Sequence, residues 1–364
     1  MAESIVKALE SRVEYLIDLA KKEPAQKSEE WLEKRLKRIN GSEISSAIGC
    51  SKYKNKKQFV KEKTIGLLGN HYFKGNQATQ HGEDFEEMSA KIYVHLNPGC
   101  VAYQACHLCH KMYDFIGCTP DYYIMVYDER EEVIDVYLLE IKCPHTRIPS
   151  DFVPEEHYHQ TMLQMEITEM RKCKRMDSRF TVCSKEIYEK MGADRVYKGV
   201  CVKAYNPIKN VYTIIHPARP EVLWSGMTTV EDLEKECEEK AEDIRRQPEK
   251  YRLFEPVVMY WFLEMYFINH IDFDETWFPR VFPTIENTWK EIQEKYVLSK
   301  ANNGQYIDPP TGRGRGARKG KGQMDVLAVL SDDEDDEESA KKNPLNALVK
   351  KVNISMQDVL SDDE

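Results

Sequence analysis

Apolar positions at the start of the chain recur with the period of a helix. Between residues 3 and 21 they recur at helical spacing: Ile5, Val6, Leu9, Val13, Leu16, Ile17 and Ala20. This spacing places them on one face and predicts an amphipathic helix. Pro24 interrupts the pattern, and Ser28 then precedes the sequence EEWLEKRLKRI. Because serine is a favoured N-cap, a second helix is predicted there, ending before the turn signal Asn40-Gly41.

The period of the apolar positions changes in the middle of the chain. Residues 76–93 predict a helix with Phe85, Met88 and Ile92 on one side, and residues 155–171 predict another. Alternating apolar positions predict strands at residues 101–112, 115–127, 133–141, 180–183, 196–204 and 211–215. Helices and strands that alternate in this way predict an α/β fold, with a mixed central sheet flanked by helices.

Two further helices are predicted towards the end of the chain, at residues 229–246 and about 256–297. The second contains two aromatic runs, YWF at residues 260–262 and YF at residues 266–267. At helical spacing such residues indicate core packing, and a platform for stacking nucleic-acid bases is the alternative.

The composition changes near residue 300. A basic stretch, TGRGRGARKGKG, is followed by an acidic one, SDDEDDEES. Neither contains enough apolar side chains to bury a core. We therefore predict a folded domain at residues 1–299 and a disordered basic and acidic tail at residues 300–364.

The net charge of −10 at first argues against a nucleic-acid partner. Seven of the acids, however, lie within residues 331–338, so local clusters are more informative than the total. Residues 51–63 contain six lysines. This lysine-rich segment is either a solvated face or a contact surface for the DNA backbone.

The ten cysteines are scattered, without the regular spacing of a disulfide scaffold. No signal peptide and no apolar run long enough to span a membrane are expected. We therefore predict reduced thiols and a cytoplasmic or nuclear location. The sequence CHLCH at residues 106–110 admits c-type haem attachment, a zinc site completed by Cys100 and Cys118, or an alternating strand; the strand is favoured.

The chemistry of the chain centres on residues 117–144. This segment contains Thr-Pro-Asp ending at Asp121, then an alternating apolar run ending in Glu140-Ile141-Lys142. Side chains alternate along a strand, so Glu140 and Lys142 point the same way. Two carboxylates held close together repel each other and are stable as ions mainly with a divalent cation between them. The lysine can orient a water molecule or offset the charge that develops on a phosphate.

Further motifs surround this segment. In GEDFE, Gly82 stands four residues before Glu86, and in WLEKRLKRINGSEI, Arg35 precedes Ser42 by seven residues. Gln160 lies in the predicted helix YHQTMLQMEI. Together with GCTPD and LLEIKCP, these motifs resemble the PD-(D/E)xK nucleases, and most closely the lambda-exonuclease and YqaJ-like viral recombinase family. The resemblance covers residues 28–215. One departure is at position 162, where methionine replaces a second glutamine found in many members.

The resemblance implies a restriction-endonuclease-like fold and a metal site. Asp121 and Glu140, with the backbone carbonyl of Ile141, would hold Mg²⁺, for which Mn²⁺ is a possible substitute. Glu86 would hold a second metal ion or a metal-bound water. Two ions about 3.5–4 Å apart stabilise both the attacking and the leaving oxygen of an in-line displacement.

The resemblance also implies roles for the remaining motif residues. Lys142 would position the attacking water, and Gln160 would orient Lys142 or the scissile phosphate. Arg35 and Ser42 resemble a pocket for the terminal 5′-phosphate, which an arginine can contact with two N–H groups.

The implied activity is Mg²⁺-dependent 5′→3′ hydrolysis of one strand of linear duplex DNA, for viral recombination, replication or repair. Family kinship implies a trimeric ring that encloses DNA, a single-strand annealing protein as partner, and action in an infected host cell. Two alternatives remain: an endonuclease of the same superfamily, and a non-catalytic protein that binds DNA ends.

Overall fold

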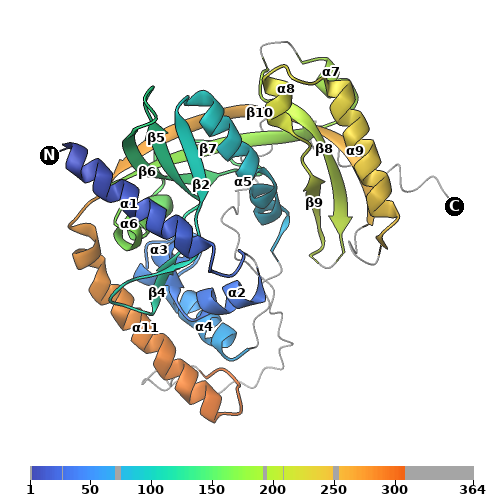
Figure 1. Ribbon diagram of the computed structural model, residues 1–364. Coiled ribbons are helices and arrows are strands. Elements are labelled where there is room, and N and C mark those ends of the chain that lie inside the picture. Colours follow the sequence, from blue (N-terminus) through green and yellow to red (C-terminus); the bar gives the residue numbers. More distant parts are fainter. Residues whose placement is uncertain are drawn as a thin grey trace.

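The centre of the molecule is a seven-stranded sheet with the order β2-β5-β6-β7-β10-β8-β9 (Figure 1). A computed structural model describes residues 2–26, 28–69, 75–191, 195–207, 209–248 and 254–307. The strands of the large sheet are β2 (Cys100–Gln104), β5 (Tyr122–Tyr127), β6 (Val133–Lys142), β7 (Lys172–Cys183), β8 (Lys198–Asn206), β9 (Val211–His216) and β10 (Phe254–Asp272). A smaller sheet has the order β1-β4-β3, from Ile39–Asn40, Ile116–Cys118 and Leu108–Cys109.

The large sheet is mixed. Strands β6 and β7 are parallel, whereas the other neighbouring pairs are antiparallel. Parallel neighbours need a crossover connection, which here contains α6 (Glu155–Thr168). The predicted α/β class, with a mixed central sheet flanked by helices, is confirmed.

The two faces of the sheet are covered by different helices. Leu138 of β6 lies in an apolar cluster with α1 (Ala2–Ala20) and α6, whereas the next residue, Leu139, lies in a cluster with Phe85 of α5 (Gln77–Leu96). This alternation follows from the two-residue period of a strand. A third cluster joins α9 (Val230–Arg245) to β8 and β10 at the far end of the sheet (Figure 1).

Two of the predicted helices begin at identifiable caps. Ser28 Oγ accepts a hydrogen bond of 3.3 Å from the Trp31 N–H at the start of α2 (Glu29–Leu36). Asn76 Oδ1 accepts one of 2.8 Å from the Thr79 N–H at the start of α5. Both bonds satisfy N–H groups that a helix leaves without internal partners. The remaining helices include η1 (Gly41–Glu43), α3 (Ile44–Ile48), α4 (Lys56–Leu67), α7 (Lys185–Glu189), α8 (Pro220–Trp224) and α11 (Trp277–Ala301).

The predicted helix at 256–297 is wrong in its first half. Residues 254–272 form β10, which is 19 residues long and pairs with both β7 and β8. Its buried aromatic residues alternate: Trp261 packs towards α5, and Tyr260 and Phe262 pack towards α9. Aromatic residues are common in strands. Because both faces of β10 are covered, its sequence is a continuous apolar run that lacks the two-residue period of a strand. The prediction that YWF belongs to the core is confirmed.

The other strands also differ from the predictions. Strand β7 begins at Lys172 rather than near residue 180, and it carries the ion pair Arg175–Asp177, with both side chains fully buried. The charged residues in this part of the strand interrupt the apolar pattern, so the sequence did not predict it. The predicted strands at 101–112 and 115–127 are each interrupted, because β3 and β4 leave the large sheet to form the smaller one.

Within the described residues, no helix is long and apolar enough to cross a membrane. The predicted tail lies outside the described residues from position 308 onward.

The place of β10 beside β8 can be tested at Gly199, which pairs with Trp261. A Cβ at this position would lie 2.9 Å from Trp261 Cζ2. We therefore expect Gly199→Ala to lower the free energy of unfolding by about 1–3 kcal/mol in urea titrations. Gly82→Ala is the control: its Cβ would lie 3.8 Å from the Cys143 carbonyl oxygen, and alanine favours the helix. Equal stability of Gly199→Ala and the unmodified protein would contradict this strand pairing.

Candidate active site

The two halves of the predicted motif meet across a β-hairpin. Strands β5 and β6 are antiparallel neighbours, with Tyr122 opposite Leu139. Asp121 lies immediately before β5, and its Oδ2 accepts a hydrogen bond of 2.6 Å from the Ile141 N–H. The carboxylate of Asp121 is thus fixed beside the backbone of the segment that contains Glu140.

Glu140 is held from both sides although its side chain is almost fully buried. Its Oε1 accepts a hydrogen bond of 2.6 Å from Gln160 Nε2 and lies 3.2 Å from Lys142 Nζ. Its Oε2 accepts a hydrogen bond of 2.8 Å from Gln164 Nε2. Donors on both oxygens stabilise the ionised form of a buried carboxylate.

Gln164 is a site residue to which the sequence analysis gave no role. Helical spacing could have indicated this role. Residues four apart on a helix share a face, so Gln160 and Gln164 both reach Glu140 from α6. The methionine at position 162 points elsewhere, and its Sδ accepts a hydrogen bond from the Asp274 N–H. Gln160, which was predicted to contact Lys142 or phosphate, donates to Glu140 instead.

Glu86 comes to the same place from α5. Burial, followed by the negative charges of Glu140 and Glu86, raises the pKa of Asp121 well above its ordinary value. The positive charge of Lys142 and the hydrogen bond from Ile141 act in the opposite direction. The structure therefore gathers three acids and one lysine, and the acids oppose one another's ionisation.

Arg35 and Ser42 also lie together. The guanidinium of Arg35 donates to Ser42 Oγ and to Thr119 Oγ1, each at 3.2 Å, and stacks 4.5 Å from the centroid of the Trp31 ring. Thr119 is two residues before Asp121, so it connects this group directly to the hairpin. It was not predicted as a site residue.

A buried brace supports Arg35. Lys63 Nζ donates to both carboxylate oxygens of Glu43, at 2.8 and 2.9 Å, and to the carbonyl oxygen of Arg35 at 3.3 Å. Lys54 is similarly buried and pairs with Glu62. Both interpretations of the lysine-rich segment 51–63 are therefore wrong for these two lysines: Lys63 connects α4 to Glu43 and Arg35, and Lys54 pairs with α4.

The CHLCH sequence lies beside this group of residues. His107 Nδ1 is 3.2 Å from Thr119 Oγ1, and burial together with the charge of Arg35 lowers the pKa of His107 to about 3. The imidazole is consequently neutral. Only Leu108 and Cys109 of this sequence form a strand, β3, so the predicted strand is shorter than expected.

A separate cluster of Cys50, Glu155 and His159 has ligand atoms within 4.8 Å of one another. However, His159 Nδ1 accepts a hydrogen bond of 2.8 Å from the Trp277 indole N–H. An indole can only donate, so a neutral His159 carries its proton on Nε2, the nitrogen that faces Glu155. That tautomer opposes metal binding at this cluster.

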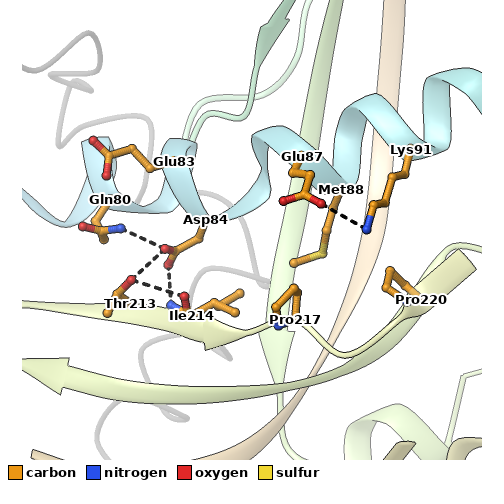
Figure 2. Close-up of a pocket in the computed structure, with 10 residues that line it drawn as sticks. All are labelled: Gln80, Glu83, Asp84, Glu87, Met88, Lys91, Thr213, Ile214, Pro217 and Pro220. Carbon is orange, nitrogen blue, oxygen red and sulfur yellow. Dashed lines mark hydrogen bonds and ion pairs between the residues drawn. The ribbon is translucent and has the colours of Figure 1, made fainter. Parts of the chain in front are cut away.

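A cavity of about 260 Å³ lies between α5 and the β9–α8 segment (Figure 2). Asp84 there accepts hydrogen bonds from Gln80 Nε2, Thr213 Oγ1 and the Ile214 N–H, each at 2.9 Å. Burial raises the pKa of Asp84 to about 6. These contacts attach the helix that carries Glu86 to the edge of the sheet, and the acidic lining disfavours phosphate.

Part of the chain is similar to a known protein family. Residues 30–171 match the model of the YqaJ-like viral recombinase domain. Curated proteins give no match.

Solved structures give several matches of low identity. An alkaline exonuclease from Laribacter hongkongensis is 15% identical, with 76% of this chain and 98% of that chain covered and a TM-score of 0.45. A phage-related exonuclease from Haemophilus somnus is 14% identical, with 73% and 96% covered and a TM-score of 0.36. KSHV SOX, in an RNA complex, is 9% identical, with 80% and 76% covered and a TM-score of 0.38. Residues 30–171 are thus similar to the YqaJ-like viral recombinase domain.

Proposed function

We propose that this chain is a Mg²⁺-dependent exonuclease that degrades one strand of linear duplex DNA in the 5′→3′ direction. The observation that supports this most strongly is the convergence of Asp121, Glu140 and Glu86 with Lys142. A protein that only binds DNA ends has no need of acids that repel one another. The match of residues 30–171 to the YqaJ-like viral recombinase domain supports a role in recombination, and viral origin and the trimeric ring are predictions from the family resemblance.

The donor set fits a hard divalent cation. Asp121, Glu140 and Glu86 offer carboxylate oxygens, and the Ile141 backbone offers a carbonyl oxygen, which are the ligand types that Mg²⁺ prefers. The raised pKa of Asp121 shows that the acids are poorly compensated by the protein alone. When bound, Mg²⁺ would supply charge stabilisation and lower the pKa of a coordinated water.

The surrounding side chains have distinct tasks in this proposal. Gln160 and Gln164 fix both oxygens of Glu140, so the carboxylate keeps one orientation. Lys142, which is partly exposed and 3.2 Å from Glu140, can move its ammonium to a phosphate oxygen and offset the charge that develops there. The Ile141 N–H holds Asp121 in place.

The Arg35 group supports the preference for ends. Its guanidinium already spans two hydroxyl groups, so its planar fork is oriented before DNA binds. A terminal 5′-phosphate monoester, which carries more charge than an internal diester, suits such a fork. The brace formed by Lys63 and Glu43 keeps the backbone of Arg35 in place.

Removal of the central acid should abolish cleavage. We expect Asp121→Asn to lower the rate on linear, 5′-phosphorylated duplex by at least ~10³-fold in Mg²⁺, because a neutral amide is a poor cation ligand. DNA affinity, measured by fluorescence anisotropy without divalent ions, should remain. Asp135→Asn is the matched control, since Asp135 lies on β6, the neighbour of β5, and pairs with Lys172. Full activity of Asp121→Asn would refute the assignment, and cleavage of closed circular DNA by the unmodified protein would favour an endonuclease.

The second glutamine should tune the metal site. Gln164→Leu removes the donor to Glu140 Oε2, so we expect a rate loss or a rise in the half-saturating Mg²⁺ concentration of about 10–100-fold. Glu166→Gln on the same helix, near His110, serves as the control. An unchanged Mg²⁺ titration for Gln164→Leu would show that this contact is structural only.

The end preference can be tested at Arg35. We expect Arg35→Ala to reduce the ratio of the rates on 5′-phosphate and 5′-hydroxyl ends to near one, mostly by slowing the phosphorylated substrate. Arg35→Lys keeps the positive charge but loses the planar guanidinium, so it should restore little of the preference for 5′-phosphate ends. Arg38→Ala changes a neighbouring arginine that contacts the Lys34 carbonyl oxygen and should leave the ratio intact. A ratio in Arg35→Ala equal to that of the unmodified protein would remove the 5′-phosphate assignment.

A further inference from the structure

Two histidines face each other beside the proposed active site. The rings of His81 on α5 and His145, three residues after Lys142, have centroids 4.9 Å apart. Helix α5 packs directly against the segment that follows Lys142, because a Cβ on Gly82 would lie 3.8 Å from the Cys143 carbonyl oxygen. These histidines therefore adjoin the catalytic hairpin on the side of α5.

The surroundings of the two histidines are cationic. Burial, together with the charges of Lys203 and Arg179, lowers the pKa of both rings, that of His145 to about 4. Arg179 pairs with Glu264, its Nε lying 3.1 Å from that carboxylate. Within the described residues, by contrast, no carboxylate lies within 4.0 Å of Lys203 Nζ. The positive charge of Lys203 is thus less compensated than that of Arg179.

One acid does lie near Lys203. The carboxylate of Asp84 acts on it electrostatically, but its oxygens are already engaged by Gln80, Thr213 and Ile214. Lys203 Nζ instead lies 5.7 Å from the centroid of the Tyr212 ring. In the described ranges Asp84 therefore acts on Lys203 without a direct ion pair, which leaves the Lys203 ammonium able to contact a further anion.

His81 supplies an independent indication of a ligand. Its side chain is buried, with 7% of the residue exposed, and in the described part of the chain its Nε2 has no hydrogen-bond partner. A buried polar atom without a partner is unfavourable unless a ligand or water supplies one. His145 and Lys203 are partly exposed, so the group opens to solvent.

We propose that His81, His145 and Lys203 bind a phosphate group of the DNA strand close to the one that is cut. This inference rests on the proposed nuclease function and extends it with a second contact to the strand. His81 precedes Glu86 by five residues, which is about 7.5 Å along a helix axis. Each nucleotide of a duplex strand rises ~3.4 Å, so the two positions suit phosphates one to three nucleotides apart.

The test measures binding without cleavage. Affinity for a linear duplex is determined by anisotropy in the Asp121→Asn background without divalent ions, over a range of salt concentrations. We expect the further change Lys203→Gln to weaken binding about 5–10-fold and to reduce the slope of log affinity against log salt by about 0.9, because one phosphate contact is lost. Lys203→Arg should retain most of the affinity.

Lys198→Gln is the matched control. Lys198 lies on the same strand, but its Nζ is 4.8 Å from the centroid of the Tyr188 ring on α7, and we expect no change in affinity or slope. Thermal unfolding checks that each variant is folded. If Lys203→Gln does not fold, His145→Gln decides the question, since its ring lies in a partly exposed loop.

Two results would overturn the inference. In the first, folded Lys203→Gln, or His145→Gln in its place, binds duplex with unchanged affinity and salt slope. In the second, Lys203→Gln weakens only the binding of a deoxynucleoside 5′-monophosphate and not that of duplex, which would assign the site to free product. Because binding is measured without turnover, neither result is confused with failure of Asp121 as a catalytic residue.

Discussion

The mutual repulsion of Asp121, Glu140 and Glu86 is the constraint on which the rest of the site depends. Burial, together with the charges of Glu140 and Glu86, raises the pKa of Asp121, so folding brings these acids together at a cost. The protein offsets only part of the repulsion, through Lys142 and the two glutamines on Glu140. A divalent cation would supply the remainder, so the same arrangement that destabilises the cation-free protein favours metal binding.

The fold places these groups by means of one crossover. Because β6 and β7 are parallel, α6 must pass over the sheet, and this brings its two glutamines above Glu140. Helix α5 covers the opposite face and delivers Glu86, while Asp84 attaches the helix to β9. The smaller sheet joins the N-terminal helices to the hairpin, so the Arg35 group and the acids share the short segment Thr119–Asp121.

Much of this arrangement could be predicted from local sequence. The hairpin around Asp121 and Glu140 follows from strand alternation, α2 follows from its serine cap, and α5 follows from helical period. The strand β10 could not be predicted in this way, since a strand buried on both faces has the continuous apolar composition of a buried helix. The start of β7 was missed for a related reason. The charges of Arg175 and Asp177 suggest a surface segment, yet the two side chains neutralise each other inside the protein. Contacts between segments far apart in the sequence determine both β10 and the start of β7.

Proton release on metal binding tests the central claim most directly. Calorimetric titration of Mg²⁺ into the protein, without DNA and near pH 7, should be repeated in buffers with different heats of ionisation. Since the pKa of Asp121 is raised in the cation-free protein, we expect binding to be accompanied by proton release, and Asp121→Asn to abolish that release. Binding of Mg²⁺ without proton release, or with the same release in Asp121→Asn, would contradict the account of the acids as a strained metal site.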